Sequence, residues 1–325
     1  MNVRPESRLA RLALGLAVVV AFAPPGRAGA AEDAAKASKD QKEKLYDPKA
    51  DAKVQVAEAT AKARRDNTRV LVMFGGDWCG WCHKLHALLK SDPAIRKTML
   101  DEYVLVSVDT KSPNADELLE RCKAALSKEE LARGVGFPFL AVLDANGKVV
   151  KAQQTDPLED GDHHDPARVR AFLKEWTAPQ ADADAKLEKA LAEAKSKGKM
   201  VFLHFGAPWC GWCHRLDDFL ARPDVAEVVG RDFVMLKVDT DRDRGGSALW
   251  TRFNPARGGI PWFAFLDADG KALTTSDGPR GNIGYPATPE EIAHFLKMLE
   301  TTHKGITKEQ IDALGDKLRA AAPKL

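Results

Sequence analysis

The string Trp-Cys-Gly-Trp-Cys-His occurs twice in the chain, at 78–83 and again at 209–214. Each copy follows a short apolar run of strand length, 70–74 or 201–205, and leads into a segment with apolar residues at helical spacing. The first cysteines of the two copies, Cys79 and Cys210, lie 131 positions apart, and an aspartate that ends the next apolar run recurs 130 positions later, at Asp109 and Asp239. The sequence therefore predicts a tandem duplication.

Further pieces repeat in the same order. A proline stands directly before a strand-length run at Pro138 and at Pro261, and an Asp-Gly-rich turn of hairpin type follows at 144–147 and 267–270. We expect a first domain at 51–178, which includes a helix at 116–131, and a second domain at 184–304. A flexible lead-in at 31–50 and a helical tail at 305–325 complete the prediction. The tail either packs on the second domain or binds a partner.

The N-terminus has the pattern of an export signal. Three arginines precede an uncharged run at 12–23, and two prolines and an Ala-Gly-Ala sequence follow. A membrane anchor is the alternative, but a spanning helix needs about 20 apolar residues. We therefore predict a cleaved signal peptide at 1–30, a periplasmic or secreted protein, and no stable membrane insertion after cleavage.

The composition excludes some classes of function. Lysine and arginine number 49 against 47 acidic residues, a net charge of +2, and no basic block is interleaved with aromatics. We therefore expect no nucleic-acid partner. A hydrophobic content of 44% is typical of a folded globular protein.

Four of the five cysteines lie in the two C-x-x-C pairs. Three chemistries use such pairs: attachment of a c-type haem through C-x-x-C-H, a redox-active dithiol, and a static disulfide on a binding or scaffold module. A c-type haem usually lies in a largely helical pocket, so the strand-like runs beside both cysteine pairs disfavour haem attachment. The two cysteine pairs lie in separate units of the chain, and this disfavours a zinc site shared between them. We predict a dithiol with no metal and no cofactor, and the dihaem carrier and the scaffold remain alternatives.

A strand, a W-C-x-x-C that opens a helix, and a proline before a hairpin resemble the thioredoxin fold. The form G-x-x-W-C-G-W-C-H-[KR]-L is most similar to the exported or periplasmic thioredoxin-like branch. The resemblance implies an α/β protein with two tandem thioredoxin-fold domains, each a central mixed β-sheet flanked by helices. It also implies a thiol-disulfide oxidoreductase, with protein thiols or disulfides and an unknown redox donor or acceptor as partners.

Cysteine position assigns the roles within each pair. A cysteine at a helix N-terminus is stabilised as the thiolate by the helix dipole and the free N–H groups. Cys79 and Cys210 are therefore the predicted nucleophiles, and Cys82 and Cys213 resolve the mixed disulfide. Cys122 stands apart in the predicted helix, where we expect a buried apolar side chain rather than a third redox thiol.

The resemblance implies further site residues. Pro138 and Pro261 would be cis and would leave the backbone of Phe137 and Ile260 free to pair with an extended substrate. Trp78 and Trp209 would pack over the active-site turn, as in the family. Trp81 and Trp212, between the cysteines, are less usual there, and their flat apolar surface either grips unfolded substrate or covers the core.

Several histidines are candidates for tuning the dithiols. Thioredoxins place a buried acid six residues before the first cysteine, and those positions here are Met73 and His204. His204 is thus either a proton carrier or a core histidine. His83 and His214, four residues after each nucleophile, favour the thiolate if they are protonated and are otherwise ordinary surface residues. His163-His164 we assign to a solvated loop, with metal binding as the alternative.

Overall fold

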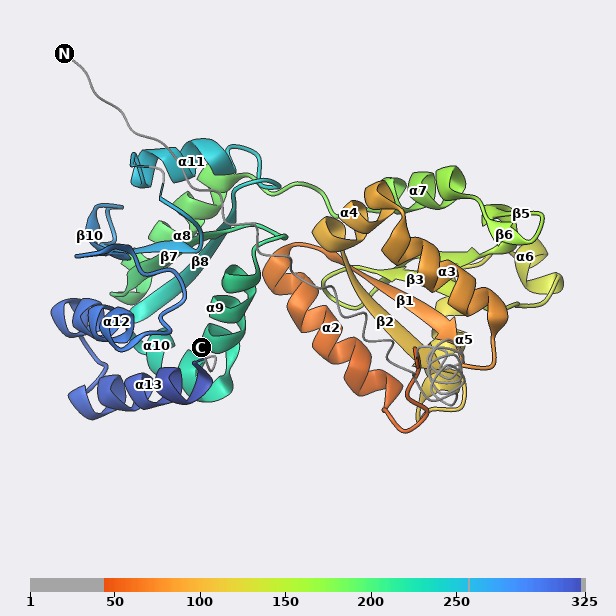
Figure 1. Ribbon diagram of the computed structural model, residues 1–325, viewed down its shortest axis with the longest axis horizontal. Coiled ribbons are helices and arrows are strands. Elements are labelled where there is room, and N and C mark those ends of the chain that lie inside the picture. Colours follow the sequence, from red (N-terminus) through yellow and green to blue (C-terminus); the bar gives the residue numbers. More distant parts are fainter. Residues whose placement is uncertain (1–43, 257, 323–325) are drawn as a thin grey trace, which may run out of the picture. The chain divides into compact units, whose positions relative to one another are not determined.

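The computed structural model describes residues 44–256 and 258–322, and the described residues from Leu45 onward form one compact unit. Two α/β halves follow one another in this unit (Figure 1). The predicted signal peptide and most of the predicted lead-in lie outside the described residues. Among the residues described, no helix is long and apolar enough to cross a membrane.

The first half contains one four-stranded sheet and a small two-stranded hairpin. Its helices are α2 (Ala52–Asp66), α3 (Gly80–Ser91), α4 (Pro93–Glu102), α5 (Ala115–Lys123), α6 (Lys128–Ala132) and α7 (Pro166–Glu175), with the short 3₁₀ turn η1 (Asp156–Leu158). Its strands are β1 (Arg69–Gly75), β2 (Tyr103–Asp109), β3 (Phe139–Leu143), β4 (Val149–Gln154), β5 (Glu159–Asp160) and β6 (His163–His164).

The sheet of the first half has the order β2-β1-β3-β4, in which β1 runs parallel to β2 and antiparallel to β3. Strand β1 is a continuous apolar run because helices cover both of its faces. Val70 and Phe74 pack in one core cluster with residues of α2 and α5, whereas Leu71 and Met73 pack in another with residues of α3 and α7. The two cores hold the end of β1, and hence the first motif, in place.

The second half repeats this plan. Its helices are α8 (Ala183–Lys197), α9 (Gly211–Ala221), α10 (Pro223–Asp232), α11 (Gly246–Phe253), α12 (Pro289–Thr302) and α13 (Lys308–Ala321). Its strands are β7 (Met200–Gly206), β8 (Phe233–Asp239), β9 (Trp262–Leu266), β10 (Ala272–Thr275), β11 (Asp277–Gly278) and β12 (Gly281–Asn282).

The sheet of the second half has the order β8-β7-β9-β10, again with one parallel pair and two antiparallel pairs. Leu203 and Phe205 face the core that α8 and α11 share, and Phe202 faces the core of α9, α10, α12 and α13. Both halves are thus mixed β-sheets flanked by helices, which confirms the predicted fold class.

Three local predictions differ from the structure. The helix expected at 116–131 is divided into α5 and α6, because the side chain of Ser127 accepts the backbone N–H of Glu130 and begins a new helix with a capping box. The lead-in at 31–50 is expected to be flexible, but within its described part, 44–50, Tyr46 is buried and its backbone N–H donates to Asp77. The second domain is expected to end at 304, but its core also includes residues of the tail helix α13.

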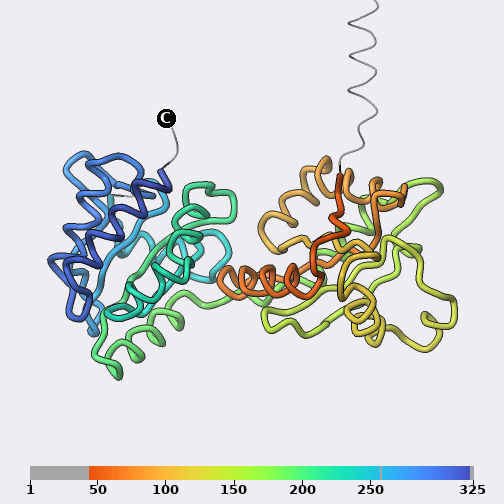
Figure 2. Tube along the Cα trace, turned by 90° about the horizontal axis from the view of Figure 1, so that it is seen from below, coloured from red at the N-terminus to blue at the C-terminus, as the bar shows by residue number. Residues whose placement is uncertain are grey.

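Helices α12 and α13 lie side by side in both views (Figure 1, Figure 2). Ile311, Leu314 and Leu318 of α13 are buried in the same cluster as Phe295 and Leu299 of α12. The prediction that the tail packs on the second half is therefore confirmed.

Candidate active site

Both C-x-x-C pairs are closed disulfides at the N-terminus of a helix. Cys79 is the N-cap of α3 and Cys210 the N-cap of α9, and the Sγ atom of each accepts the backbone N–H of its partner cysteine at 3.1 Å. A sulfur in this place meets the positive end of the helix dipole, which stabilises a thiolate. The geometry fits Cys79 and Cys210 as the attacking sulfurs, the role predicted for them.

A cis-proline backbone lies against each pair. The peptide bonds Phe137–Pro138 and Ile260–Pro261 are both cis, as the resemblance implied. The carbonyl oxygen of Phe137 is 3.6 Å from the Sγ atom of Cys79, and that of Ile260 is 3.6 Å from the Sγ atom of Cys210. The backbone of Phe137 and Ile260 thus lies beside a disulfide sulfur, and the substrate pairing expected of it stays a prediction.

Comparison with known proteins agrees with this geometry. Residues 56–155 match the family described as a thioredoxin-like domain, and residues 182–268 match one described as thioredoxin-like. Protein disulfide-isomerase 1 of Dictyostelium discoideum is 25% identical over 211 residues, which are 62% of this chain and 53% of that protein. Thiol:disulfide interchange protein DsbD of Vibrio cholerae is 29% identical over 121 residues, which are 33% of this chain and 20% of that protein.

The chain contains two thioredoxin-like domains. A crystal structure of a disulphide isomerase from Xylella fastidiosa Temecula1 is 29% identical, with a TM-score of 0.32, over 38% of this chain and 93% of that one. The chain spans about half of the Dictyostelium relative and about a fifth of the Vibrio relative.

The tryptophans of the two thioredoxin-like domains have different surroundings. Trp78 and Trp209 are 58% and 59% exposed. The ring of Trp78 covers Gly76 and meets Phe137 edge-on, while the indole N–H of Trp209 donates to Asp241. The second tryptophans also diverge: Trp81 is half-buried against His164, whereas Trp212 is 46% exposed and stacks on Tyr285. The two domains therefore present different surfaces beside otherwise similar disulfides.

The motif histidines hold the turn before each disulfide. The Nε2 atom of His83 is 3.0 Å from the carbonyl oxygen of Asp77, and that of His214 is 2.7 Å from the carbonyl oxygen of Pro208. Since a carbonyl oxygen only accepts, the ring nitrogen donates, and the proton is thereby placed on Nε2. This contact gives the histidines a positioning role, and their predicted effect on the thiolates stays a prediction.

The position six residues before the first cysteine also differs between the domains. Met73 is fully buried in an apolar core, whereas the buried His204 lies with its Nδ1 atom 3.6 Å from a carboxylate oxygen of Asp217. Asp217 in turn accepts from Lys237 at 2.6 Å. Burial lowers the pKa of His204 to about 4, although Asp217 raises it. The ring is therefore neutral at pH 7.

Sequence reasoning missed Asp217 and Lys237. Asp217 lies one helical turn after Cys213 on the buried side of α9, and Lys237 is the cross-strand neighbour of His204 in the parallel pair β7–β8. The spacing of four after Cys213 was a usable signal for Asp217. Lys237 required the register of the sheet.

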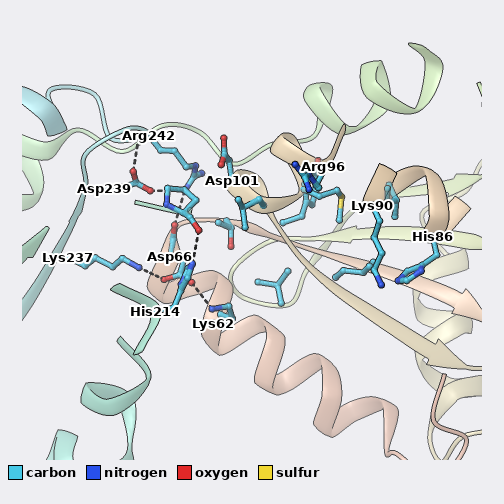
Figure 3. A pocket seen from close by; sticks show the side chains of 18 residues that line it. Lys62, Asp66, His86, Lys90, Arg96, Asp101, His214, Lys237, Asp239 and Arg242 are labelled. Atoms are coloured by element: carbon cyan, nitrogen blue, oxygen red, sulfur yellow. Dashed lines mark hydrogen bonds and ion pairs between the residues drawn. The ribbon is translucent and has the colours of Figure 1, made fainter. Parts of the chain in front are cut away.

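Lys237 and Arg242 also contact residues of the first domain within the compact unit. Figure 3 shows Lys237 pointing toward Asp66, and the two are 2.7 Å apart. Arg242 donates to both carboxylate oxygens of Glu102, at 3.1 and 2.7 Å, and to the backbone carbonyls of Asp66 and Asn67. Burial raises the pKa of Asp66, but the positive charges of Lys237, Lys62 and Arg65 and the hydrogen bond from Lys237 together hold that pKa below its usual value.

The remaining candidates have structural surroundings. Cys122 is fully buried with a free thiol, and burial raises its pKa to about 11, which confirms the expected buried side chain. His163 and His164 form β6 rather than an irregular loop, and His164 is buried. Within the described ranges, no cluster of three or more His, Cys, Asp or Glu residues fits a metal ion.

Proposed function

We propose that the protein is an extracytoplasmic thiol-disulfide oxidoreductase that exchanges dithiols and disulfides with protein substrates at both sites. The observation that carries the proposal is the arrangement at Cys79 and Cys210. Each sulfur caps a helix, closes a disulfide with the next cysteine of its motif, and lies beside the carbonyl that precedes a cis-proline. The names of the relatives, a protein disulfide-isomerase and a thiol:disulfide interchange protein, support the same chemistry.

The proposed exchange begins at the helix-capping sulfur. A substrate thiolate attacks Cys79, a new sulfur–sulfur bond forms to the substrate, and the bond to Cys82 breaks with its electron pair left on Cys82. In the reducing direction the same steps run backwards, and Cys82 attacks the mixed disulfide. Cys210 and Cys213 perform the same steps in the second domain.

A redox titration tests this proposal. The full chain without residues 1–30 is equilibrated with glutathione buffers, its thiols are trapped, and each C-x-x-C is counted separately. We expect two reversible transitions, and C79S and C210S each to abolish exchange at their own site alone. Dithiols on this fold span about −270 to −120 mV, so the midpoints also assign a reducing or an oxidising role. Pairs that stay closed across the whole range would mean structural disulfides and would refute the proposal.

The proposed location has its own test. The arginines, the apolar run and the Ala-Gly-Ala sequence at the N-terminus motivate it. Expression of the full chain in a bacterium, followed by fractionation and N-terminal sequencing, is expected to give a periplasmic protein that begins near Ala31. An intact N-terminus in the cytoplasmic fraction would contradict export.

A further inference from the structure

A buried tyrosine, Tyr46, packs against the first active site, although it lies in the segment before the duplicated part of the chain. Tyr46 precedes α2, and the backbone N–H groups of Leu45 and Tyr46 both donate to one carboxylate oxygen of Asp77, at 2.9 and 3.2 Å. Asp77 lies two residues before Cys79. The Tyr46 side chain is 2% exposed and packs in the same cluster as Cys79 and Cys82. The segment is therefore tied to the active-site turn.

The hydroxyl group of Tyr46 lies close to the resolving sulfur. A Cβ atom on Gly75 would lie 2.4 Å from the Sγ atom of Cys82 and 2.8 Å from the hydroxyl oxygen of Tyr46. Both atoms thus border one small space, and their separation is no greater than these two distances added together. The absence of a side chain on Gly75 leaves that space open.

This hydroxyl group has no hydrogen-bond partner among the described residues while the disulfide is closed. Buried polar groups nearly always have a partner, so an unpaired O–H beside a reactive sulfur calls for a reason. Burial raises the pKa of Tyr46, and the carboxylates of Asp77 and Asp109 raise it further. The group therefore stays protonated and acts as a donor, never as a base.

We propose that Tyr46 donates a hydrogen bond to the Cys82 thiolate when the first disulfide opens. This inference rests on the proposed function. When a substrate thiolate attacks Cys79, the electron pair of the broken bond moves to Cys82, and the sulfur gains a full negative charge. The Tyr46 proton stays on its oxygen and solvates that charge. Hydrogen bonds to charged groups are stronger than those between neutral groups, so the donor gains most in the open state.

The second domain lacks this arrangement. At Gly206, which takes the place of Gly75, the described atoms within 4 Å of an added Cβ belong to Cys213 alone. The second domain instead holds the buried set of His204, Asp217 and Lys237. A change at Tyr46 is therefore expected to alter the first site and leave the second unchanged.

The effect has a definite sign. The hydroxyl group has no partner while the disulfide is closed and gains the free Cys82 sulfur as an acceptor once the disulfide opens, so it stabilises the reduced form and makes the disulfide a stronger oxidant. Tyr46→Phe removes the hydroxyl group and keeps the buried ring. We expect it to shift the thiol–disulfide equilibrium of the first site about tenfold toward the disulfide, which corresponds to about 30 mV.

The experiment compares Tyr46→Phe with Tyr103→Phe in the glutathione titration of the mature chain. Tyr103 belongs to the same core cluster, but its hydroxyl group donates to the carbonyl oxygen of Leu173. We expect the first midpoint to move in Tyr46→Phe alone and the second midpoint to stay constant in both variants. Equal first midpoints in Tyr46→Phe and the wild type would overturn the tyrosine proposal by itself. A wild type that exchanges at neither site would overturn it together with the proposed function.

A measurement on the wild type covers the case in which Tyr46→Phe does not fold. The chain has three tyrosines, so ¹³Cζ labelling gives three resonances that the Tyr103 and Tyr285 variants assign. Reduction by dithiothreitol is expected to shift the Tyr46 resonance and to slow exchange of its hydroxyl proton, with Tyr103 unmoved. An unchanged Tyr46 resonance would overturn the proposal.

Discussion

At the scale of single residues, each domain buries one neutral histidine. Burial lowers the pKa of His164 to about 4, with Lys84 and His163 adding to the effect, and burial also lowers the pKa of His204 to about 4. In the unfolded chain both rings recover a pKa near 6.5. Below that pH the unfolded state binds protons that the folded state excludes, and the folded state loses stability.

This difference predicts acid sensitivity. The stability that each neutral histidine contributes is complete above about pH 6.5 and is lost as the pH falls toward 4, with a slope that approaches 1.4 kcal/mol per pH unit for each ring. His204→Met, which introduces the residue that the first domain has at Met73, is expected to flatten the slope for the second domain. Urea unfolding at several pH values between 4 and 7 measures it. An unchanged slope would mean that His204 titrates normally in the fold.

At the scale of elements, helix α13, which follows the duplicated part of the chain, contributes to the core of the second domain. Its buried residues belong to one core cluster with residues of α10, α12 and the sheet, and Gly315 lets the helix approach the side chain of Leu296, which would lie 2.7 Å from an added Cβ. Lys317 also pairs with Asp224 at the start of α10. The core of the second domain thus includes residues beyond 304, the end expected from the sequence.

We therefore expect Leu314→Ala to destabilise the second domain by about 2–5 kcal/mol, because a buried leucine leaves a cavity. Leu314 is 1% exposed. Asp312→Ala, on the exposed side of the same helix, is the matched control and should change stability by no more than about 0.5 kcal/mol. Urea unfolding followed by tryptophan fluorescence measures both. Equal effects of the two variants would contradict the integration of α13 into the core.

At the scale of the whole molecule, Arg242 provides contacts between residues of the two domains. Its guanidinium group is nearly buried and bonds to Glu102 and to two backbone carbonyls of the first domain. A bidentate, partly buried arginine pair is among the stronger ion pairs, and removal of the arginine leaves its acceptors unpaired. This residue is therefore expected to couple the unfolding of the two domains.

Arg242→Ala is expected to separate the thermal unfolding of the two domains into two calorimetric transitions. Arg244→Ala is the control, because Arg244 donates two N–H groups to one carboxylate oxygen of Asp182, which belongs to the second domain, and its side chain is 73% exposed. Its unfolding should resemble that of the wild type. A single transition in Arg242→Ala would contradict this expectation and would show that the other contacts, such as Lys237–Asp66, suffice to couple the domains.

The sequence predicts much of the fold and the positions of the reactive cysteines, but not the polar residues around them. The duplication, the buried central strands and the position of Cys79 and Cys210 at strand-to-helix junctions follow from local patterns, because apolar runs, turn residues and motif spacing act over a few residues. The signal that divides the helix expected at 116–131 is also local, because Ser127 and Glu130 form a capping box three residues apart.

The sequence by itself determined that two similar α/β domains each carry a dithiol at the start of a helix. Tertiary structure alone decided which polar groups surround those dithiols. The hydroxyl group of Tyr46 borders the same small space as the sulfur of Cys82, 36 positions later. The register of β7 and β8 sets Lys237 beside His204, where it donates to Asp217. Such contacts join residues that share no local pattern. They depend on how the segments pack, and the strength of an electrostatic contact depends on the burial that packing creates.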